Sequence, residues 1–174
     1  MAKPKKKLTL AEKADKFQCY QKSVQTPEHE VEFFEQAYRE ANGQKIPVSL
    51  REDFCGTFAV CCEWVQSKRE RTALGVDLCD ETLQWGRDHN LVKLSEEEQS
   101  RVRLLEQDVR KRNRPAVDVL AAQNFSFWLF KTRSELLDYF KIISKLSKLG
   151  TDDCTLSQNY RRQNSIIMYK RIFV

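Results

Sequence analysis

The sequence lacks three features that would each define a class of protein. It contains no apolar run of ~18 residues, so no transmembrane helix is predicted. No apolar stretch long enough for a secretory signal follows the basic N-terminus. The six cysteines form no C-x-x-C pair, and the only histidines, His29 and His89, stand apart from them in the sequence. We therefore expect reduced, mostly buried thiols in a cytoplasmic protein that has no metal site.

Charge is distributed unevenly along the 174 residues, a length typical of one domain. The net charge is +5, but residues 51–130 hold 12 Lys/Arg and 14 Asp/Glu, which gives −2. Residues 131–174 hold 9 Lys/Arg and 4 Asp/Glu, which gives +5. The basic character therefore lies at the ends of the chain, which argues against a nucleic-acid-binding core.

Two short basic clusters still leave a nucleic-acid partner open. The first lies in residues 1–8, an arm that we expect to be disordered; it fits nuclear import or nucleic-acid binding, and a solvated terminus explains it more simply. The second follows a predicted strand and is either a solvated loop or a surface that steers an anionic substrate. The residues are Lys3, Lys5, Lys6 and Lys7 in the arm, and Arg110, Lys111, Arg112 and Arg114 in the loop.

Two helices are predicted to form an N-terminal cap over residues 9–43. Thr9 and Glu12 have the spacing of a capping box, which predicts a helix over about residues 10–22. Pro27 is suited to the first position of a second helix, in which apolar residues recur at 31, 34, 37, 38 and 41. Gly43 then ends this helix.

Strands and helices alternate over residues 44–150. Strands are predicted at 48–50, 72–77, 102–106 and 117–122, and helices at about 58–68, 80–90 and 132–148, with a helical turn after Ser95. This order predicts a Rossmann-like α/β fold with a parallel sheet and helices on both faces. We expect four parts: the arm, the cap, this core and an atypical tail over residues 151–174.

Acidic or amide side chains stand at the carboxyl ends of all four predicted strands, where open parallel sheets bind their ligands. Asp77 also lies 21 residues after Gly56, the spacing at which an acid reaches both ribose hydroxyls of a nucleoside bound over the first strand–helix turn. Each residue alone is explained as well by a turn or a helix cap. Their joint occurrence predicts a site for a nucleoside cofactor. The residues at the strand ends are Glu52, Asp53, Asp77, Asp108 and Asn124.

These segments resemble the cofactor motifs of the class I S-adenosylmethionine-dependent methyltransferases. Residues 49–57 resemble the glycine-rich first motif, and residues 75–78 the second, whose acid holds the cofactor ribose. Residues 106–110 resemble the third, whose acid contacts the adenine amino group, and residues 117–126 the fourth, beside the methyl group. Positions 20, 23–25, 27 and 30 fit an uncharacterised subgroup that shares this first motif.

The resemblance covers about residues 20–148 and implies methyl transfer from S-adenosyl-L-methionine to an unidentified acceptor. Because in-line transfer of a methyl group needs little acid–base chemistry, no catalytic base is predicted. Phe54 and Phe58 stand where the family has its outer glycines, and Phe58 could crowd the methionine end of the cofactor. The implied cofactor-binding residues are Glu52, Asp53, Cys55, Gly56, Thr57, Asp77, Leu78, Asp108, Val109 and Asn124. Of these, Cys55 is expected to be a packed turn residue and not a nucleophile.

The resemblance ends near Gly150. It implies that a fifth strand and an antiparallel sixth–seventh hairpin should follow, yet only residues 165–174 have the pattern of a strand. That segment is expected either to cover the edge of the fourth strand or to aggregate. We therefore expect a truncated isoform with impaired activity. The alternative is a non-catalytic isoform or interaction protein that keeps part of the methyltransferase fold.

Overall fold

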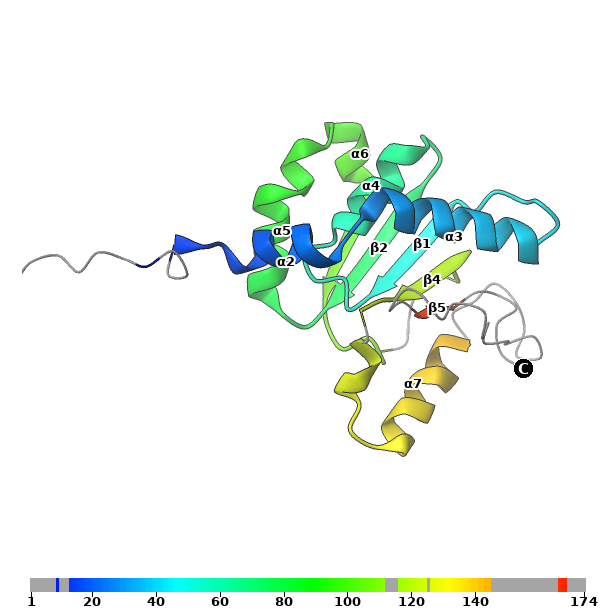
Figure 1. The fold of residues 1–174 in the computed structure, drawn as a ribbon. Coiled ribbons are helices and arrows are strands. Elements are labelled where there is room, and N and C mark those ends of the chain that lie inside the picture. The colour runs from blue at the N-terminus through cyan, green and yellow to red at the C-terminus, as the bar shows by residue number, and fades with distance from the viewer. Residues whose placement is uncertain (1–8, 10–12, 112–115, 125, 145–165, 169–174) are drawn as a thin grey trace, which may run out of the picture.

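The computed structural model describes residues 9, 13–111, 116–124, 126–144 and 166–168, which are shown in Figure 1. The helices are α2 (Lys16–Val24), α3 (Pro27–Ala41), α4 (Ala59–Ser67), α5 (Asp80–His89), α6 (Glu96–Ser100) and α7 (Arg133–Ser144). The strands are β1 (Ser49–Asp53), β2 (Thr72–Asp77), β3 (Val102–Glu106), β4 (Val119–Ala122) and β5 (Ile166–Met168). Two short 3-10 helices are η1 (Leu91–Lys93) and η2 (Ser126–Leu129).

The strands form one sheet in the order β3-β2-β1-β4-β5. The first four strands are parallel, with Glu52 beside Gly75 on β2 and Ala121 on β4. The predicted Rossmann-like α/β fold is thus confirmed. β5 is antiparallel to β4, with Ile167 opposite Ala121. The C-terminal segment therefore covers the edge of β4, one of the two outcomes expected for it.

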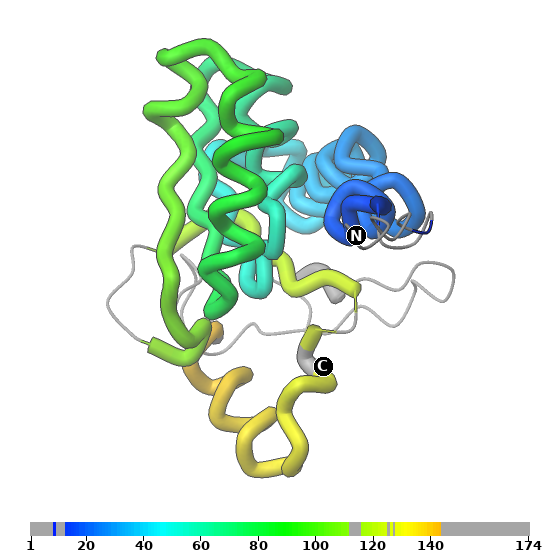
Figure 2. Tube along the Cα trace, turned by 90° about the vertical axis from the view of Figure 1, so that its left-hand side faces the viewer, coloured from blue at the N-terminus to red at the C-terminus, as the bar shows by residue number. Residues whose placement is uncertain are grey.

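Helices cover both faces of the sheet (Figure 1). On one face, Val60 and Trp64 of α4 pack with Phe34 of α3 in a single apolar cluster. On the other face, Tyr139 and Ile143 of α7 pack with residues of β2 and β4. In the view turned by 90° (Figure 2), α2 and α3 (blue) lie beside the green helices, and α7 (orange) lies apart from them. The carboxyl ends of the parallel strands therefore open between the cap helices and α7.

The first strand is longer than its apolar run predicts. β1 extends through Arg51 to Asp53, and Arg51 and Asp53 are 0% exposed. Arg51 Nε donates to Asp53 Oδ1 at 2.6 Å, and the hydroxyl of Tyr139 donates to Asp53 Oδ2 at 2.9 Å. Because a buried charge is tolerated when it is paired and hydrogen-bonded, these charged residues continue the strand instead of ending it.

The continuous helix predicted over residues 10–22 is wrong in the part that is described. Ala14 and Asp15 interrupt it, and α2 starts at Lys16. The Asp15 carboxylate accepts hydrogen bonds from the N–H groups of Phe17 and Gln18 at 2.9 and 3.1 Å, which makes Asp15 the N-cap. The predicted capping box of Thr9 and Glu12 depends on residues outside the described part.

The other predicted helix starts are confirmed. Pro27 occupies the first turn of α3, and Gly43 has φ +62° shortly after its end. Ser95 and Glu98 form a reciprocal capping box at α6. At the start of α7, the Thr132 N–H donates to the Glu135 carboxylate at 3.0 Å, and the Glu135 N–H donates to the Thr132 hydroxyl at 3.2 Å.

The basic clusters are described only in part. Lys3, Lys5, Lys6, Lys7, Arg112 and Arg114 lie outside the described residues. Arg110 forms an ion pair with Asp108, and Lys111 is exposed. Within the described part of the chain, no helix is both long and apolar enough to span a membrane.

Candidate functional site

The loop after β1 alternates in backbone conformation. Phe54, Gly56 and Phe58 have φ values of +60°, +54° and +45°, in the left-handed region that glycine adopts without cost. For a bulky side chain this region is strained by roughly 1–2 kcal/mol. The loop therefore has the backbone that a three-glycine pattern would permit, although phenylalanine occupies two of its positions. We call residues 54–58 the glycine loop.

Packing explains how the two phenylalanines are held. The Phe58 side chain is fully buried against α5, where a Cβ added to Gly86 would lie 2.4 Å from Phe58 Cε1. The Phe54 ring lies 6.0 Å from the Phe130 ring and 5.9 Å from the Tyr139 ring. The burial of Phe58 directs it into the core and away from the strand ends. The expected crowding of a ligand by Phe58 is therefore not found.

Asp77 ties the end of β2 to the glycine loop. Its Oδ2 accepts a hydrogen bond from the N–H of Gly56 at 2.8 Å, and its Oδ1 accepts one from the N–H of Cys79 at 2.9 Å. Each carboxylate oxygen can accept a second hydrogen bond. Asp77 is thus fixed in orientation and still has acceptor capacity for a ligand.

Asp108 is held by its neighbour Arg110. The guanidinium donates to both carboxylate oxygens, with Nη2 to Oδ2 at 2.6 Å and Nε to Oδ1 at 3.0 Å. These hydrogen bonds hold the pKa of Asp108 below its usual range. The Arg110 guanidinium also lies 5.4 Å from the centre of the Phe130 ring. Asp108 is therefore an ionised, oriented acceptor at the end of β3.

Two cavities lie at the strand ends and share Phe54 and Ser126 in their walls. We call the first, of about 470 Å³, the adenosine-side cavity, after the nucleoside that the sequence motifs predict at Asp77 and Asp108. It is lined by Phe54, Asp77, Leu78, Asp108, Val109, Arg110, Ser126, Leu129, Phe130 and Glu135. The second, of about 440 Å³, is called the glycine-loop cavity. It is lined by Lys16, Phe17, Tyr20, Gln25, Glu52, Phe54, Cys55, Gly56, Thr57, Thr82, Gln123, Asn124 and Ser126.

The sequence-predicted residues are divided between these cavities. Asp77, Leu78, Asp108 and Val109 line the adenosine-side cavity, and Glu52, Cys55, Gly56, Thr57 and Asn124 line the glycine-loop cavity. Asp53 lines neither. Because side chains alternate along a strand, Asp53 faces α7 while Glu52 faces the opposite side. Asp53 belongs instead to the buried network with Arg51 and Tyr139.

Glu52 is almost completely buried at the end of β1, with 2% of its surface exposed. Burial raises the pKa of Glu52 to about 8, although the hydrogen bond that the Cys61 thiol donates to it at 3.1 Å opposes the shift. Burial also raises the pKa of Cys55 well above its usual value. Cys55 therefore stays a protonated thiol packed against Gly75, as expected of a turn residue and not of a nucleophile.

Sequence reasoning placed Gln123 at the end of the fourth strand but did not include it, or Tyr20 and Gln25, among the cofactor-binding residues. Tyr20 and Gln25 come from the cap helix α2 and the residue after it, and Gln123 directly follows β4. Positions 20 and 25 were noted only through the resemblance to a methyltransferase subgroup. Nothing in the local pattern of α2 predicts that it packs over the end of β1, because that placement depends on contacts between segments distant in the sequence.

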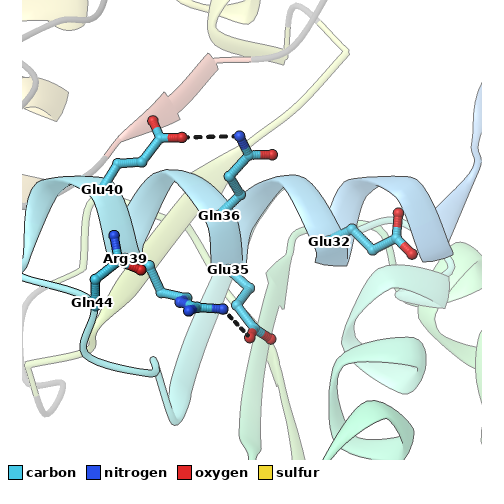
Figure 3. A pocket seen from close by; sticks show the side chains of 6 residues that line it. All are labelled: Glu32, Glu35, Gln36, Arg39, Glu40 and Gln44. Carbon is cyan, nitrogen blue, oxygen red and sulfur yellow. Dashed lines mark hydrogen bonds and ion pairs between the residues drawn. The ribbon is translucent and has the colours of Figure 1, made fainter.

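A further hollow, of about 340 Å³, lies on α3 and is shown in Figure 3. Gln36 and Glu40 project from one side of the helix and are joined by a hydrogen bond of 2.9 Å. Glu35 projects from the other side and pairs with Arg39 at 3.8 Å and with Arg71. These side chains pair with one another or with neighbouring elements, as expected of a solvated helix face. Among the described residues, no group of His, Cys, Asp and Glu side chains is placed to hold a metal ion.

Comparison with known proteins gives matches only among solved structures. No family model and no curated protein matches the chain. An amino pentose methyltransferase from Micromonospora echinaspora, solved with SAM bound, matches with a TM-score of 0.60 and 16% identity over 86% of this chain and 56% of its own. A sugar N-methyltransferase from Streptoalloteichus sp. matches with a TM-score of 0.59 and 16% identity over 84% of this chain and 55% of its own. The plantazolicin methyltransferase, solved with SAH, matches with a TM-score of 0.54 and 20% identity over 71% of this chain and 45% of its own.

These likenesses define the fold. The chain has the Rossmann-like α/β fold of these methyltransferase structures. It spans about half the length of the structures it matches.

Proposed function

We propose that the protein is an S-adenosylmethionine-dependent methyltransferase. The observation that carries this proposal is the position of the Asp77 carboxylate, which is anchored by the Gly56 N–H beside the adenosine-side cavity. An acid at the end of the second strand of such a fold can accept both hydroxyls of a ribose. Fold and site thus support the same class of cofactor.

The residues of the adenosine-side cavity suit a nucleoside. Leu78, Val109 and Phe130 provide apolar surface for a base, and Asp108 provides an ionised acceptor for an amino group. Leu78 is 67% exposed, so much of its surface is open for contact. In this proposal the base packs against these side chains and the ribose lies at Asp77.

The glycine-loop cavity suits the amino-acid part of the cofactor. A Cβ on Gly56 would meet only Thr82 Cγ2, at 3.7 Å, so the backbone here is open to close approach. Phe58, the N-cap of α4, makes no side-chain capping bond. The Cys61 N–H in the first turn is already bonded by the Glu52 carboxylate, so a ligand carboxylate would use the N–H groups of Ala59 and Val60. Both features fit the methionine moiety of S-adenosylmethionine.

The cofactor would supply a methyl group on a positively charged sulfur. The task of the chain is then to hold the acceptor in line with that group and to exclude water. Phe54 and Ser126 stand at the boundary shared by the cavities, where the two parts of the cofactor would meet. No acid–base residue is required for the displacement itself, in agreement with the absence of a predicted catalytic base.

Calorimetric titration of the full chain tests this function. We expect S-adenosylmethionine and S-adenosylhomocysteine to bind with micromolar affinity, and NAD, a different nucleoside cofactor, to bind far more weakly. The absence of heat and of any thermal shift at millimolar S-adenosylhomocysteine would overturn the proposal. That result would favour the alternative in which the fold is retained without catalysis.

A further inference from the structure

Three side chains beside the glycine-loop cavity contain buried polar atoms without partners. They are Gln25, Glu30 on α3, and Gln123 after β4, and we call them the Gln25–Glu30–Gln123 cluster. By ordinary hydrogen-bond geometry, Gln25 Oε1, Glu30 Oε2, Gln123 Oε1 and Gln123 Nε2 have no partner among the described residues. The Gln123 side chain still lies near enough to the Glu30 carboxylate to oppose the rise in its pKa. Gln25 and Gln123 line the cavity, and Gln123 is only 4% exposed.

Buried polar atoms without partners are rare in folded proteins, and each costs about 1–3 kcal/mol. A ligand that supplies the missing hydrogen bonds removes this cost. Three of the four atoms are acceptors, so the complementary ligand is mainly a donor.

The titratable groups around the cluster are mostly acidic. Burial raises the pKa of Glu30 and of Glu52, and the Glu30 carboxylate adds to the shift at Glu52. Both carboxylates also raise the pKa of the Tyr20 phenol, after the larger effect of its burial. The one basic residue of the cavity wall, Lys16, pairs with Glu81 at 2.7 Å and is mostly exposed. A cation entering this region would stabilise the ionised forms of these acidic groups.

We propose that the Gln25–Glu30–Gln123 cluster binds the amino group of the methyl acceptor, so that the protein methylates an amine. The inference rests on the proposed function and specifies its acceptor. The N–H groups donate to Gln25 Oε1, Glu30 Oε2 and Gln123 Oε1, while Gln123 Nε2 donates to an acceptor atom elsewhere on the substrate. Phe17, Tyr20 and Phe54 line the same cavity and provide apolar surface for the rest of the molecule.

The methyl transfer needs no reactant beyond the amine, the cofactor and a proton acceptor. A bound ammonium first gives one proton to the Glu30 carboxylate or to water, which frees the nitrogen lone pair. That lone pair forms the new N–C bond as the methyl–sulfur bond breaks, and the electron pair of the broken bond stays on sulfur. The sulfur becomes a neutral thioether, and the methylated nitrogen carries the positive charge until it releases a proton to water.

A matched pair of probes tests the inference. The full chain is first titrated with S-adenosylhomocysteine, and the saturated protein is then titrated with benzylamine or with benzyl alcohol, which has the same shape and no ammonium. We expect benzylamine to bind at least about tenfold more tightly than the alcohol, since a hydrogen bond to a charged group contributes about 1.5–3 kcal/mol. Equal affinities, or no binding of benzylamine at millimolar concentration, would overturn the inference.

Variants distinguish binding of the methyl acceptor from binding of the cofactor. The distinction is needed because the cofactor also carries an amino group. Glu30→Gln and Gln123→Leu should each weaken benzylamine binding about tenfold and leave the affinity for S-adenosylhomocysteine unchanged. Glu32→Gln, on the exposed side of the same helix, serves as the control. If the two variants weaken S-adenosylhomocysteine instead, the cluster holds the amino group of the cofactor and the inference is wrong. If S-adenosylhomocysteine does not bind the wild-type protein at all, the proposed function fails first, and the inference fails with it.

Discussion

The carboxylate of Asp77 accepts a hydrogen bond from the backbone N–H of Gly56, with 2.8 Å between Oδ2 and the nitrogen. The two residues are 21 positions apart in the chain and lie at the ends of neighbouring parallel strands. This contact orients the acid at the adenosine-side cavity. Together with the hydrogen bond that the Cys55 N–H donates to the Val76 carbonyl at 3.1 Å, it fixes the strained glycine loop against β2. In the proposed function, loop conformation and ligand binding therefore depend on the same side chain.

Substitution of Asp77 should separate these two effects. Asp77→Ala leaves the N–H groups of Gly56 and Cys79 without their acceptors, which should lower the free energy of unfolding by about 1–3 kcal/mol. Asp77→Asn keeps one acceptor oxygen and should destabilise less. Both variants should weaken S-adenosylhomocysteine binding at least about tenfold, because the charge that accepts the ribose hydroxyls is lost. Urea unfolding and calorimetry measure the two quantities, and Asp88→Asn on the exposed side of α5 is the control.

Gly86 is the position where packing beneath the glycine loop is tightest. A Cβ at residue 86 would lie 2.4 Å from Phe58 Cε1 and 2.6 Å from the Thr57 carbonyl oxygen. Gly86→Ala should therefore displace the loop and lower the free energy of unfolding by about 1–3 kcal/mol, although alanine favours a helix. Gln84→Ala, an exposed site on the same helix, should leave the free energy of unfolding within about 0.5 kcal/mol of the wild type. A Gly86→Ala protein as stable as the wild type would contradict this packing.

The Arg51–Asp53–Tyr139 network should contribute strongly to stability. Tyr139→Phe removes the hydroxyl that donates to Asp53 Oδ2 and should cost about 1–3 kcal/mol. Arg51→Met leaves the buried Asp53 carboxylate without its ion pair and should cost about 3–5 kcal/mol. It also removes the hydrogen bond that Arg51 Nη2 donates to the Val109 carbonyl at 2.8 Å, next to Asp108. Urea unfolding of the two variants, with Lys141→Met as an exposed control, measures these differences; a smaller loss for Arg51→Met than for Tyr139→Phe would contradict the assignment.

Glu52 should make stability depend on pH. The pKa of Glu52 is about 8 in the folded protein, and 4.5 is the value expected in the unfolded chain. Between these values the folded state holds a proton that the unfolded state has released, so the free energy of unfolding should fall as pH rises from about 4.5 to about 8. Glu52→Gln keeps an acceptor for the Cys61 thiol and removes this dependence.

The difference between the two proteins isolates Glu52, since Glu30 and Asp53, whose pKa values are also raised, are present in both. Relative to the variant, the wild type should lose stability by at most about 1.4 kcal/mol per pH unit. Urea midpoints measured from pH 5 to pH 8 give the slope. Parallel curves for the two proteins would show that Glu52 is ionised throughout.

The order of strands and helices follows from local patterns. Apolar runs of strand length, capping boxes at Ser95 and Thr132, and Pro27 at a helix start each predict their element correctly. The nine predicted residues that line the two cavities were found because the carboxyl ends of parallel strands meet at one edge of the sheet.

What local patterns cannot predict depends on contacts between distant segments. Asp53 is directed away from the cavities because Arg51 and Tyr139, two and 86 positions away, pair with it. Phe58 is accommodated because Gly86 of another helix leaves space for its ring. Asp15 interrupts the predicted first helix, and its carboxylate also accepts a hydrogen bond from Trp85 Nε1 at 2.7 Å, a partner 70 positions away.

The most direct test of the central claim is a crystal structure of the full chain with S-adenosylhomocysteine. We predict that both ribose hydroxyls lie within hydrogen-bonding distance of the Asp77 carboxylate, with the adenine between Leu78 and Phe130 and the amino-acid part against Gly56. Density for the ligand elsewhere on the chain, or ribose hydroxyls out of reach of Asp77, would contradict the account.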